Sequence, residues 1–541
     1  MKSITIKKLY KLHSWVGLIT GILLFVIAFT GAVAVFARSE LMIWANDHIR
    51  SPIDITPQKY EAIVEEYSQK VDPAYLEEIH IQFPAVRSTD NIRLIFEGHF
   101  EQENGKEDHK GVVFELHPIT FEQVSRTDME EYFNHPKLDM AMFLAHFHAD
   151  LHLGRPVGLI LTGLLGLTLM VSIVTGLIIH RKILAQLFTF RPKRNFSLLL
   201  NDGHKAMSVW GVLFHSVIAF TGAFLGLATV LLVPAAAYVS FNGDQEALLE
   251  KFTAVKAPVV ANVESLTKVA HILENSKKSY PDLTFTNFTI MGYGDKNAAM
   301  YVFGAGNEQL GRQALVFNGA TAEFVRHQAN FGRLEGVTGK ILDAMFPLHF
   351  GNFGGIFIKA LWAVLGISTA LLPITGLMLW IERGLNTANP AHSRNTYEMF
   401  NRLLIGSCAG VVLAAVALFP AQLILNKFYA LNDHTSAVFF IFFSVWMFAI
   451  TLGLVVKKKC AVHVLGYSIA SCLLITMPLD AILSGSHIFN VIHTKHFVSM
   501  GVNLTTFVLG VLLVLAMMKV KAKQAINQSV SHIDEYQRET A

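Results

Sequence analysis

The heptapeptide Val26-Ile27-Ala28-Phe29-Thr30-Gly31-Ala32 occurs a second time, without change, as Val217-Ile218-Ala219-Phe220-Thr221-Gly222-Ala223. The two copies lie 191 residues apart, and the same offset joins His13 to His204. A long-period repeat defines the architectural unit of a chain and is therefore the first pattern to identify. We infer a duplicated unit whose first helix is apolar and begins with a histidine.

The end of this unit is repeated as well. Thr175-Gly176-Leu177 corresponds to Thr375-Gly376-Leu377 at an offset of 200 residues. His148 and His349 precede these motifs and match after a one-residue shift, whereas His152 requires a three-residue shift. His152 follows His148 by four residues, so both lie on the same face of a helix. The unit is thus predicted to be helix, outer domain, helix.

The amino-acid composition indicates that these helices lie in a membrane. Of the 541 residues, 52% are hydrophobic and 16% are charged, whereas soluble domains carry about 25% charged residues. The net charge of +3 gives no argument for binding nucleic acid. With three cysteines and no C-x-x-C-H motif, the chain is not predicted to attach haem covalently.

Eight windows have the approximately 20 apolar residues that a membrane span requires. They cover roughly 13–37, 156–180, 207–237, 356–381, 403–425, 436–456, 461–483 and 497–518. Lysine and arginine are concentrated before the first span and after every even-numbered one, which predicts that both termini are cytoplasmic. We therefore expect a multi-pass membrane protein, and the family resemblance given below implies that its membrane is the bacterial inner membrane.

The predicted fold class is an all-α polytopic membrane protein with eight transmembrane helices and two small α+β periplasmic domains. Runs such as 92–96 and 314–317 indicate strands within those domains. The predicted division is a cytoplasmic N-terminus with the first span (1–37), periplasmic domain 1 (38–147), the second span (148–182), a basic cytoplasmic loop (183–203), the third span (204–239), periplasmic domain 2 (240–347), the fourth span (348–383), a cytoplasmic loop (384–402), four additional helices (403–518) and a cytoplasmic tail (519–541).

Imidazole is costly in hydrocarbon, and within a membrane it tends to mark a functional site. The repeat predicts one histidine pair per leaflet, His13 with His204 near the cytoplasm and His148 with His349 near the outside. Two such pairs suit two b-type haems with bis-histidine ligation, which leaves no open iron position and favours electron transfer. His152 is the alternative outer ligand. The alternative interpretation of these histidines is that they make interfacial hydrogen bonds and bind no metal.

The Thr-Gly motifs and His215 allow two interpretations each. The Thr-Gly motif of each span is expected beside the histidine pair of the opposite leaflet, where glycine permits close approach to a flat macrocycle. Small residues also mediate ordinary packing between membrane helices. His215 lies in mid-span, where either a role beside the electron path or a buried structural role fits the sequence.

The motifs Leu12-His13-Ser14-Trp15-Val16-Gly17, Phe147-His148-Ala149-Asp150-Leu151 and Leu348-His349-Phe350-Gly351-Asn352-Phe353-Gly354-Gly355 resemble the PepSY-associated transmembrane family, as does Thr375-Gly376-Leu377-Met378-Leu379-Trp380. The resemblance covers about residues 5–385. This family includes iron-regulated inner-membrane proteins and siderophore-iron reductases, and it implies PepSY-like periplasmic domains with two haems in some members. Relatives with a flavin and nicotinamide module differ from this chain, which has no G-x-G-x-x-G motif.

The functional expectation is a dihaem oxidoreductase in the lipid bilayer that passes electrons to a periplasmic acceptor. By resemblance, that acceptor is a ferric siderophore or another iron chelate, and the electron donor is a separate cytosolic reductase or a quinol. One alternative is a non-catalytic scaffold or regulator whose PepSY-like domains bind a periplasmic peptidase or sensor. A transporter is a further alternative, since membrane repeats are frequent among transporters.

Overall fold

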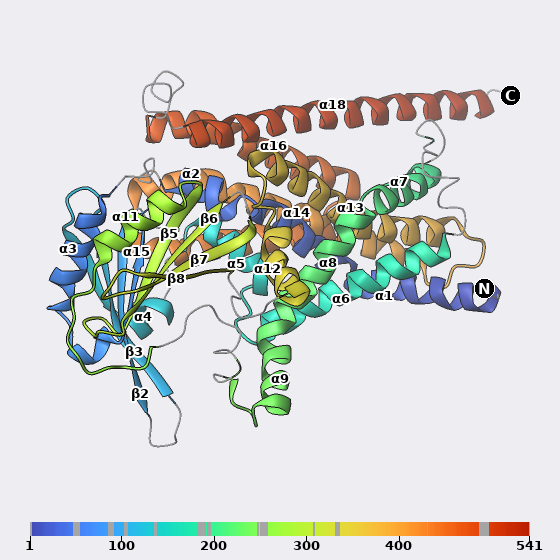
Figure 1. Cartoon of the computed structure of the whole chain (residues 1–541). Coiled ribbons are helices and arrows are strands. Elements are labelled where there is room, and N and C mark those ends of the chain that lie inside the picture. The colour runs from blue at the N-terminus through green and yellow to red at the C-terminus, as the bar shows by residue number, and fades with distance from the viewer. Residues whose placement is uncertain are drawn as a thin grey trace.

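A bundle of long helices carries an eight-stranded sheet at one end (Figure 1). The computed structural model describes residues 3–46, 55–84, 91–101, 107–134, 138–180, 191, 196–245, 248, 258–306, 309–329, 336–429, 431–485 and 497–539. Among these residues, seven unbroken helices are long and apolar enough to cross a membrane, or eight spans if one bent pair counts as a single span. The chain is therefore a multi-pass membrane protein.

The helices of the two repeated units form a closed ring. α1 packs against α13 and α6, α8 packs against α6, and α7 packs against α13. Glycines permit close contacts between these helices, because a Cβ on Gly166 would lie 2.7 Å from the backbone nitrogen of Ala223, and one on Gly366 would lie 2.9 Å from the Cβ of Ala32. The bounds are α1 (Ser3–Ala34), α6 (Val157–Ile179), α7 (Phe196–Trp210), α8 (Val212–Leu227) and α13 (Gly355–Asn386).

The third predicted span is broken. α7 and α8 meet at 70° around Gly211, so a straight helix over 207–237 is wrong. The side chain of His215 lies across the break, with its Nε2 3.1 Å from the carbonyl oxygen of Met207 and its Nδ1 2.8 Å from Thr369 Oγ1. A Cβ on Gly211 would approach His215 Nε2 to 2.2 Å, so this position requires glycine. α8 then continues through a π-helical turn, Ala228–Leu232, into α9 (Val233–Ser240).

Separate short helices precede the second and fourth spans. They are α5 (Met140–Asp150) and α12 (Gly336–Phe350), whereas the sequence placed the spans from residues 148 and 348. The Asp139 side chain caps α5 by accepting a hydrogen bond from the Met142 amide. Both helices end in left-handed backbone, at Leu151 (φ 56°) and Gly351 (φ 66°). The chain then turns into α6 and α13.

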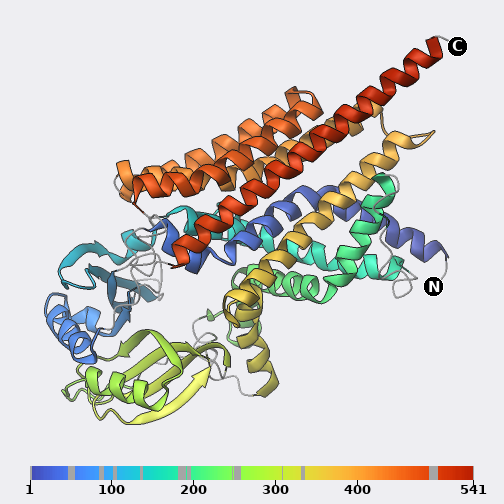
Figure 2. The same cartoon turned by 90° about the horizontal axis from the view of Figure 1, so that it is seen from above.

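The additional C-terminal helices pack mainly on one another, along one side of the ring (Figure 2). A buried polar chain joins this layer to the rest. Trp44 Nε1 donates to Asn503 Oδ1 at 2.9 Å, and Asn503 Nδ2 donates to Asp480 Oδ2 at 2.6 Å. The helices are α14 (Arg394–Phe428), α15 (Leu431–Val455), α16 (Lys458–Leu483) and α18 (Phe497–Glu539), and α2 (Met42–Ala45) carries Trp44 after a π-helical turn at Ala37–Leu41.

The two outer segments form a single antiparallel sheet in the order β4-β3-β2-β1-β5-β6-β7-β8. β1 of the first unit pairs with β5 of the second, with His80 opposite Thr289 at the centre, so the two predicted domains are joined. α3 (Pro57–Ser68) and α11 (Val269–Ser279) pack together and cover one face. The strands are β1 (Glu78–Gln82), β2 (Ile92–Glu101), β3 (Glu107–Leu116), β4 (Gln123–Asp128), β5 (Leu283–Met291), β6 (Ala299–Gly306), β7 (Gln309–Asn318) and β8 (Phe324–Ala329); a 3-10 turn, Pro73–Leu76, precedes β1, and α4 (Met129–Asn134) follows β4.

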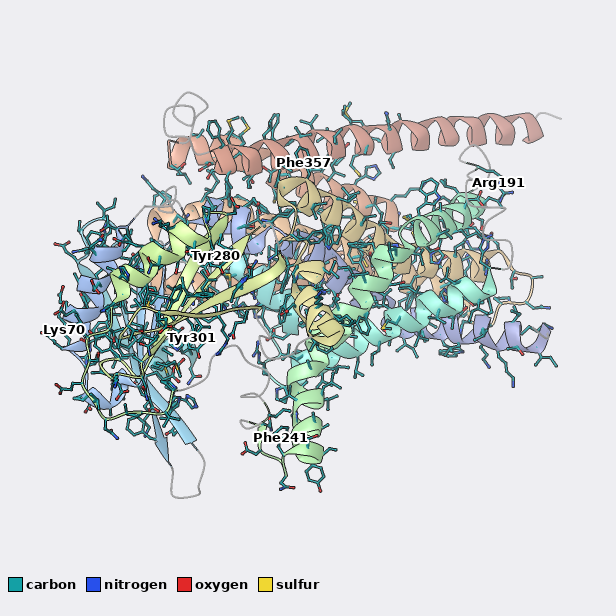
Figure 3. The ribbon with its side chains drawn as sticks, viewed as in Figure 1. Lys70, Arg191, Phe241, Tyr280, Tyr301 and Phe357 are labelled. Carbon is teal, nitrogen blue, oxygen red and sulfur yellow. The ribbon has the colours of Figure 1, made fainter. Side chains whose placement is uncertain are left out.

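Both termini lie at the end of the helical bundle that is farthest from the sheet (Figures 1 and 2). Figure 3 places Lys70, on the sheet side, and Arg191, beside α7, at opposite ends of the molecule. The arrangement agrees with the alternation of spans inferred from the basic flanks. That the termini are cytoplasmic remains a prediction.

Candidate functional site

The first histidine pair lies at the end of the ring away from the sheet. His13 comes from α1 and His204 from α7, and the centroids of the two rings are 6.4 Å apart with an interplanar angle of 82°. His13 Nδ1 lies 3.0 Å from Thr175 Oγ1, and His204 Nδ1 lies 2.9 Å from Thr375 Oγ1. The helix–helix contact is therefore made twice, by equivalent residues of the two units.

The hydrogen bonds of the two threonines assign the proton of each ring to one nitrogen. The Thr175 hydroxyl donates to the Val171 carbonyl at 2.6 Å, and that of Thr375 donates to the Leu371 carbonyl at 2.9 Å. Each hydroxyl oxygen then accepts from the imidazole, so Nδ1 is the protonated nitrogen. The lone pair is left on Nε2, which makes no hydrogen bond within the described residues. This is the tautomer that metal-ligating histidines adopt when a neighbouring group binds Nδ1–H.

The second pair lies at the sheet end of the ring. His148 of α5 and His349 of α12 have ring centroids 6.1 Å apart and an interplanar angle of 25°. His349 Nδ1 bonds Thr221 Oγ1 at 2.9 Å, whereas His148 Nδ1 bonds the Ile27 carbonyl at 3.0 Å. A carbonyl only accepts, so the Nδ1 of His148 also carries the proton. The units differ here, because Thr30, the repeat counterpart of Thr221, bonds only backbone carbonyls.

A glycine lies against each of the four rings. A Cβ on Gly31 would lie 2.7 Å from His148 Cε1, closer than side chains tolerate. At Gly176, Gly222 and Gly376 the corresponding distance to the facing Cε1 is 3.3 to 3.5 Å. The histidine that begins or precedes each span lies at one end of the ring, and the Thr-Gly motif of that span lies at the other end, beside the other histidine pair. This is the placement that the repeat predicts. Packing between helices is provided instead by glycines such as Gly166.

The donor set and its spacing fit a bis-histidine haem iron. Neutral imidazole is a normal axial ligand. With metal–nitrogen bonds of about 2 Å and about 1.1 Å from nitrogen to ring centre, two imidazoles on opposite sides of one metal have centroids about 6 Å apart. The centroid distances of 6.4 and 6.1 Å match this value. All four histidines keep partial solvent exposure, so none is enclosed by protein atoms.

His152 does not join the outer pair. Its Nε2 lies 3.0 Å from the Phe143 carbonyl and must donate to it, while its ring packs against Phe143 and Phe439. The His152 ring therefore bonds back to α5, the helix that it follows. At α12 the Trp362 indole makes the equivalent bond, because it donates to the Leu348 carbonyl. His215 has both ring nitrogens engaged at the α7–α8 break, which supports the structural interpretation.

Cationic side chains accompany each pair. Lys205 directly follows His204 on α7, and the Arg38 guanidinium lies 5.5 Å from the ring centre of Phe350, which packs against His349. Arg402 lies apart from both pairs and donates to the Leu454 carbonyl. The Arg383 guanidinium, on α13, bonds the Tyr10 hydroxyl of α1.

The two pairs are linked by one continuous helix. Ile27, whose carbonyl holds His148, follows His13 by 14 residues on α1. At 1.5 Å per residue, the two sites are about 21 Å apart along the helix axis. α1 thus carries His13 near one end of the ring and, near the other end, the carbonyl that holds His148.

Two known groups of sequences are similar to this chain. A family model described as the PepSY-associated TM region matches residues 10–383, which include both histidine pairs and the sheet and end before α14. An uncharacterized protein of Pseudomonas aeruginosa is 26% identical over 304 residues, which is 52% of this chain and 72% of that protein. The matched region is the duplicated part of the fold.

Proposed function

Because this chain belongs to the PepSY-associated TM family, we propose that it is a dihaem b-type oxidoreductase of the bacterial inner membrane. Its four ligands are His13 with His204 and His148 with His349. Electrons enter at the inner pair and leave from the outer pair to a periplasmic acceptor. The observation that carries this proposal is that the rings of each pair lie about 6 Å apart and are held through Nδ1, while Nε2 makes no hydrogen bond to the part of the chain that the structure describes.

The chain's own groups orient and insulate the sites. Thr175, Thr375 and Thr221, together with the Ile27 carbonyl, fix the tautomer and orientation of the four rings. A haem held by either pair would supply one-electron transfer between ferric and ferrous states, with the two imidazoles as its ligands. The cations near each pair suit the carboxylates of porphyrin side chains.

The proposed acceptor is a ferric siderophore or a related ferric chelate, which the family resemblance favours. Hard oxygen ligands hold ferric iron more firmly than ferrous iron, so one electron is enough to release the metal. No nucleophile or acid–base pair is needed. The donor is a separate cytosolic reductase or quinol that delivers electrons near α7.

The test is spectroscopic and uses the full chain purified in detergent. We expect two haems b per chain by the pyridine haemochrome assay and a dithionite-induced α band. His13→Ala or His204→Ala should remove one haem, and His148→Ala or His349→Ala should remove the other. Absence of a Soret band from the wild-type protein, or loss of both haems in every variant, would overturn the assignment.

His152→Ala is the matched control for the outer pair. Its ring lies on the same helix end as His148, yet its Nε2 is committed to the Phe143 carbonyl. The variant should keep both haems. If His152→Ala loses the outer haem while His148→Ala retains it, the outer ligand has been assigned to the wrong residue.

A further inference from the structure

Three imidazoles and three carboxylates gather on the face of the sheet that α3 and α11 leave uncovered. Residues on a strand alternate between its two faces. Ile79 and Phe96 point into the core beneath the helices, so their neighbours point to the other face. The cluster consists of Glu77, Glu78, His80, Glu97, His99 and His109, from β1, its leading residue, β2 and β3.

Within the cluster, Glu97, His99 and His109 each offer a ligand atom, and these atoms lie within 4.8 Å of one another. Strand pairing places His99 directly opposite His109, with ring centroids 4.4 Å apart. Glu97 precedes His99 by two residues on the same face, and its Oε1 lies 2.5 Å from His109 Nδ1. The backbone register of two rigid strands therefore sets the positions of all three side chains.

A carboxylate already orients one of these rings. His99 Nδ1 lies 3.1 Å from Glu77 Oε1, and the other oxygen of Glu77 accepts from the His99 amide at 3.0 Å. Glu77 therefore leaves the Nε2 of His99 directed to the rest of the cluster. Metal-ligating histidines characteristically pair their second nitrogen with a carboxylate in this way.

The remaining members form the wall of the site. His80 Nδ1 lies 2.9 Å from Thr289 Oγ1 on β5, and its Nε2 is 3.1 Å from Glu78 and 3.6 Å from Glu97. His80 thus holds the carboxylates of Glu78 and Glu97 at one side of the cluster.

We propose that Glu97, His99 and His109 bind one divalent first-row transition-metal ion on the outer sheet, with Glu77 as the positioning residue of His99. Two imidazoles and one carboxylate are nitrogen and oxygen donors of the kind that such ions prefer, and a three-ligand set leaves coordination positions open. Ligand bonds of about 2.0–2.2 Å put donor atoms at most about 4.4 Å apart, so a small side-chain movement closes the site.

The site does not depend on the proposed electron transfer, because its ligands lie on the sheet and not in the helical ring. The experiment uses the full chain in detergent, stripped with EDTA, desalted and titrated with Zn²⁺ by calorimetry, with bound zinc counted by mass spectrometry. The double variant His99→Ala/His109→Ala should bind one zinc fewer per chain than the wild type. His271→Ala, an exposed histidine of α11 in the same domain, should match the wild type.

Two further variants make the outcome decisive if the double variant folds poorly. The nearly isosteric Glu97→Gln should also lose one zinc, whereas Glu77→Gln should keep the site with affinity reduced about 10- to 100-fold. Equal zinc content in the wild type, Glu97→Gln and the double variant would show that the cluster is only a network of ion pairs. The haem spectrum of every variant should stay unchanged, which separates this result from the test of the histidine pairs.

Discussion

Replacing Thr221 by Val should loosen one ligand of the outer pair, whereas the same change at its repeat counterpart Thr30 should not. Both threonines are buried, with relative exposures of 1% and 0%, so the two substitutions disturb packing to a similar extent. Thr221 accepts from His349 Nδ1 at 2.9 Å. Thr30 bonds only backbone carbonyls, and His148 relies on the Ile27 carbonyl instead.

The magnitude follows from the group left without a partner. A buried N–H that loses its acceptor costs about 1–3 kcal/mol. At 1.4 kcal/mol per factor of ten, Thr221→Val should weaken retention of the outer haem about 5- to 150-fold. The assay is the rate at which haem passes from the purified protein to excess apomyoglobin, with the inner haem as an internal reference. Equal rates for Thr221→Val and Thr30→Val, or no change for either, would refute the assignment of Thr221 as the partner that fixes His349.

Three further outcomes follow from the structure. Gly31→Ala should displace His148, because the new Cβ would lie 2.7 Å from the ring where about 3.4 Å is ordinary contact, and a reduced-minus-oxidised spectrum should show a smaller outer-haem signal. Despite burial, the hydrogen bonds and charges of Glu78 and Glu97 raise the pKa of His80 from 6.5 to about 9. In EDTA-treated protein the resulting stability is complete below pH 6.5 and is lost as the pH rises through about 9. Thermal unfolding measured against pH should show this decline in the wild type and not in His80→Gln. Asn503→Leu should lower the free energy of unfolding by about 2–3 kcal/mol, measured by thermal unfolding, because Oδ2 of the buried Asp480 loses its donor and the Trp44 indole N–H loses its acceptor.

Each of these outcomes has a matched control. Gly376→Ala places a Cβ at 3.5 Å from the facing ring, so loss of a haem in that variant would mean that the glycines serve a purpose other than clearing the histidines. An unfolding profile of His80→Gln that parallels the wild type at every pH would remove His80 from the stability argument. Thr505 lies on the same helix as Asn503, and its hydroxyl bonds only the Gly501 carbonyl. If Thr505→Val loses as much stability as Asn503→Leu, the polar chain is excluded as the cause.

Repetition was the most informative property of the sequence. It identified His13, His204, His148 and His349 as a set, and the structure brings them together in the predicted two pairs. That these residues bind haem remains a prediction. The apolar windows located the long helices well, because span length is set by the thickness of the bilayer and not by contacts within the protein.

Other features depended on contacts that no sequence window contains. At the break, the ring of His215 occupies the space that a side chain on Gly211 would need, and nothing in the hydropathy of 207–237 indicates the break. The choice of His148 over His152 as the outer ligand depended on the Phe143 carbonyl, which lies nine residues before His152 and bonds its ring. The joining of the two outer segments through β1 and β5 is a pairing between strands about 200 residues apart, and the strand pattern alone does not determine such a partner.

The pairing of β1 with β5 has a consequence for the ancestry of the fold. A single unit would leave the edge of β1 unpaired. It would form half of the helical ring and supply one histidine to each pair. It would be complete only beside a second copy, in a two-fold symmetric dimer whose edges pair as β1 and β5 do now. Fusion of two copies in one chain makes that encounter intramolecular and independent of protein concentration. It also frees the two halves to diverge, and the different partners of His148 and His349 are one such divergence.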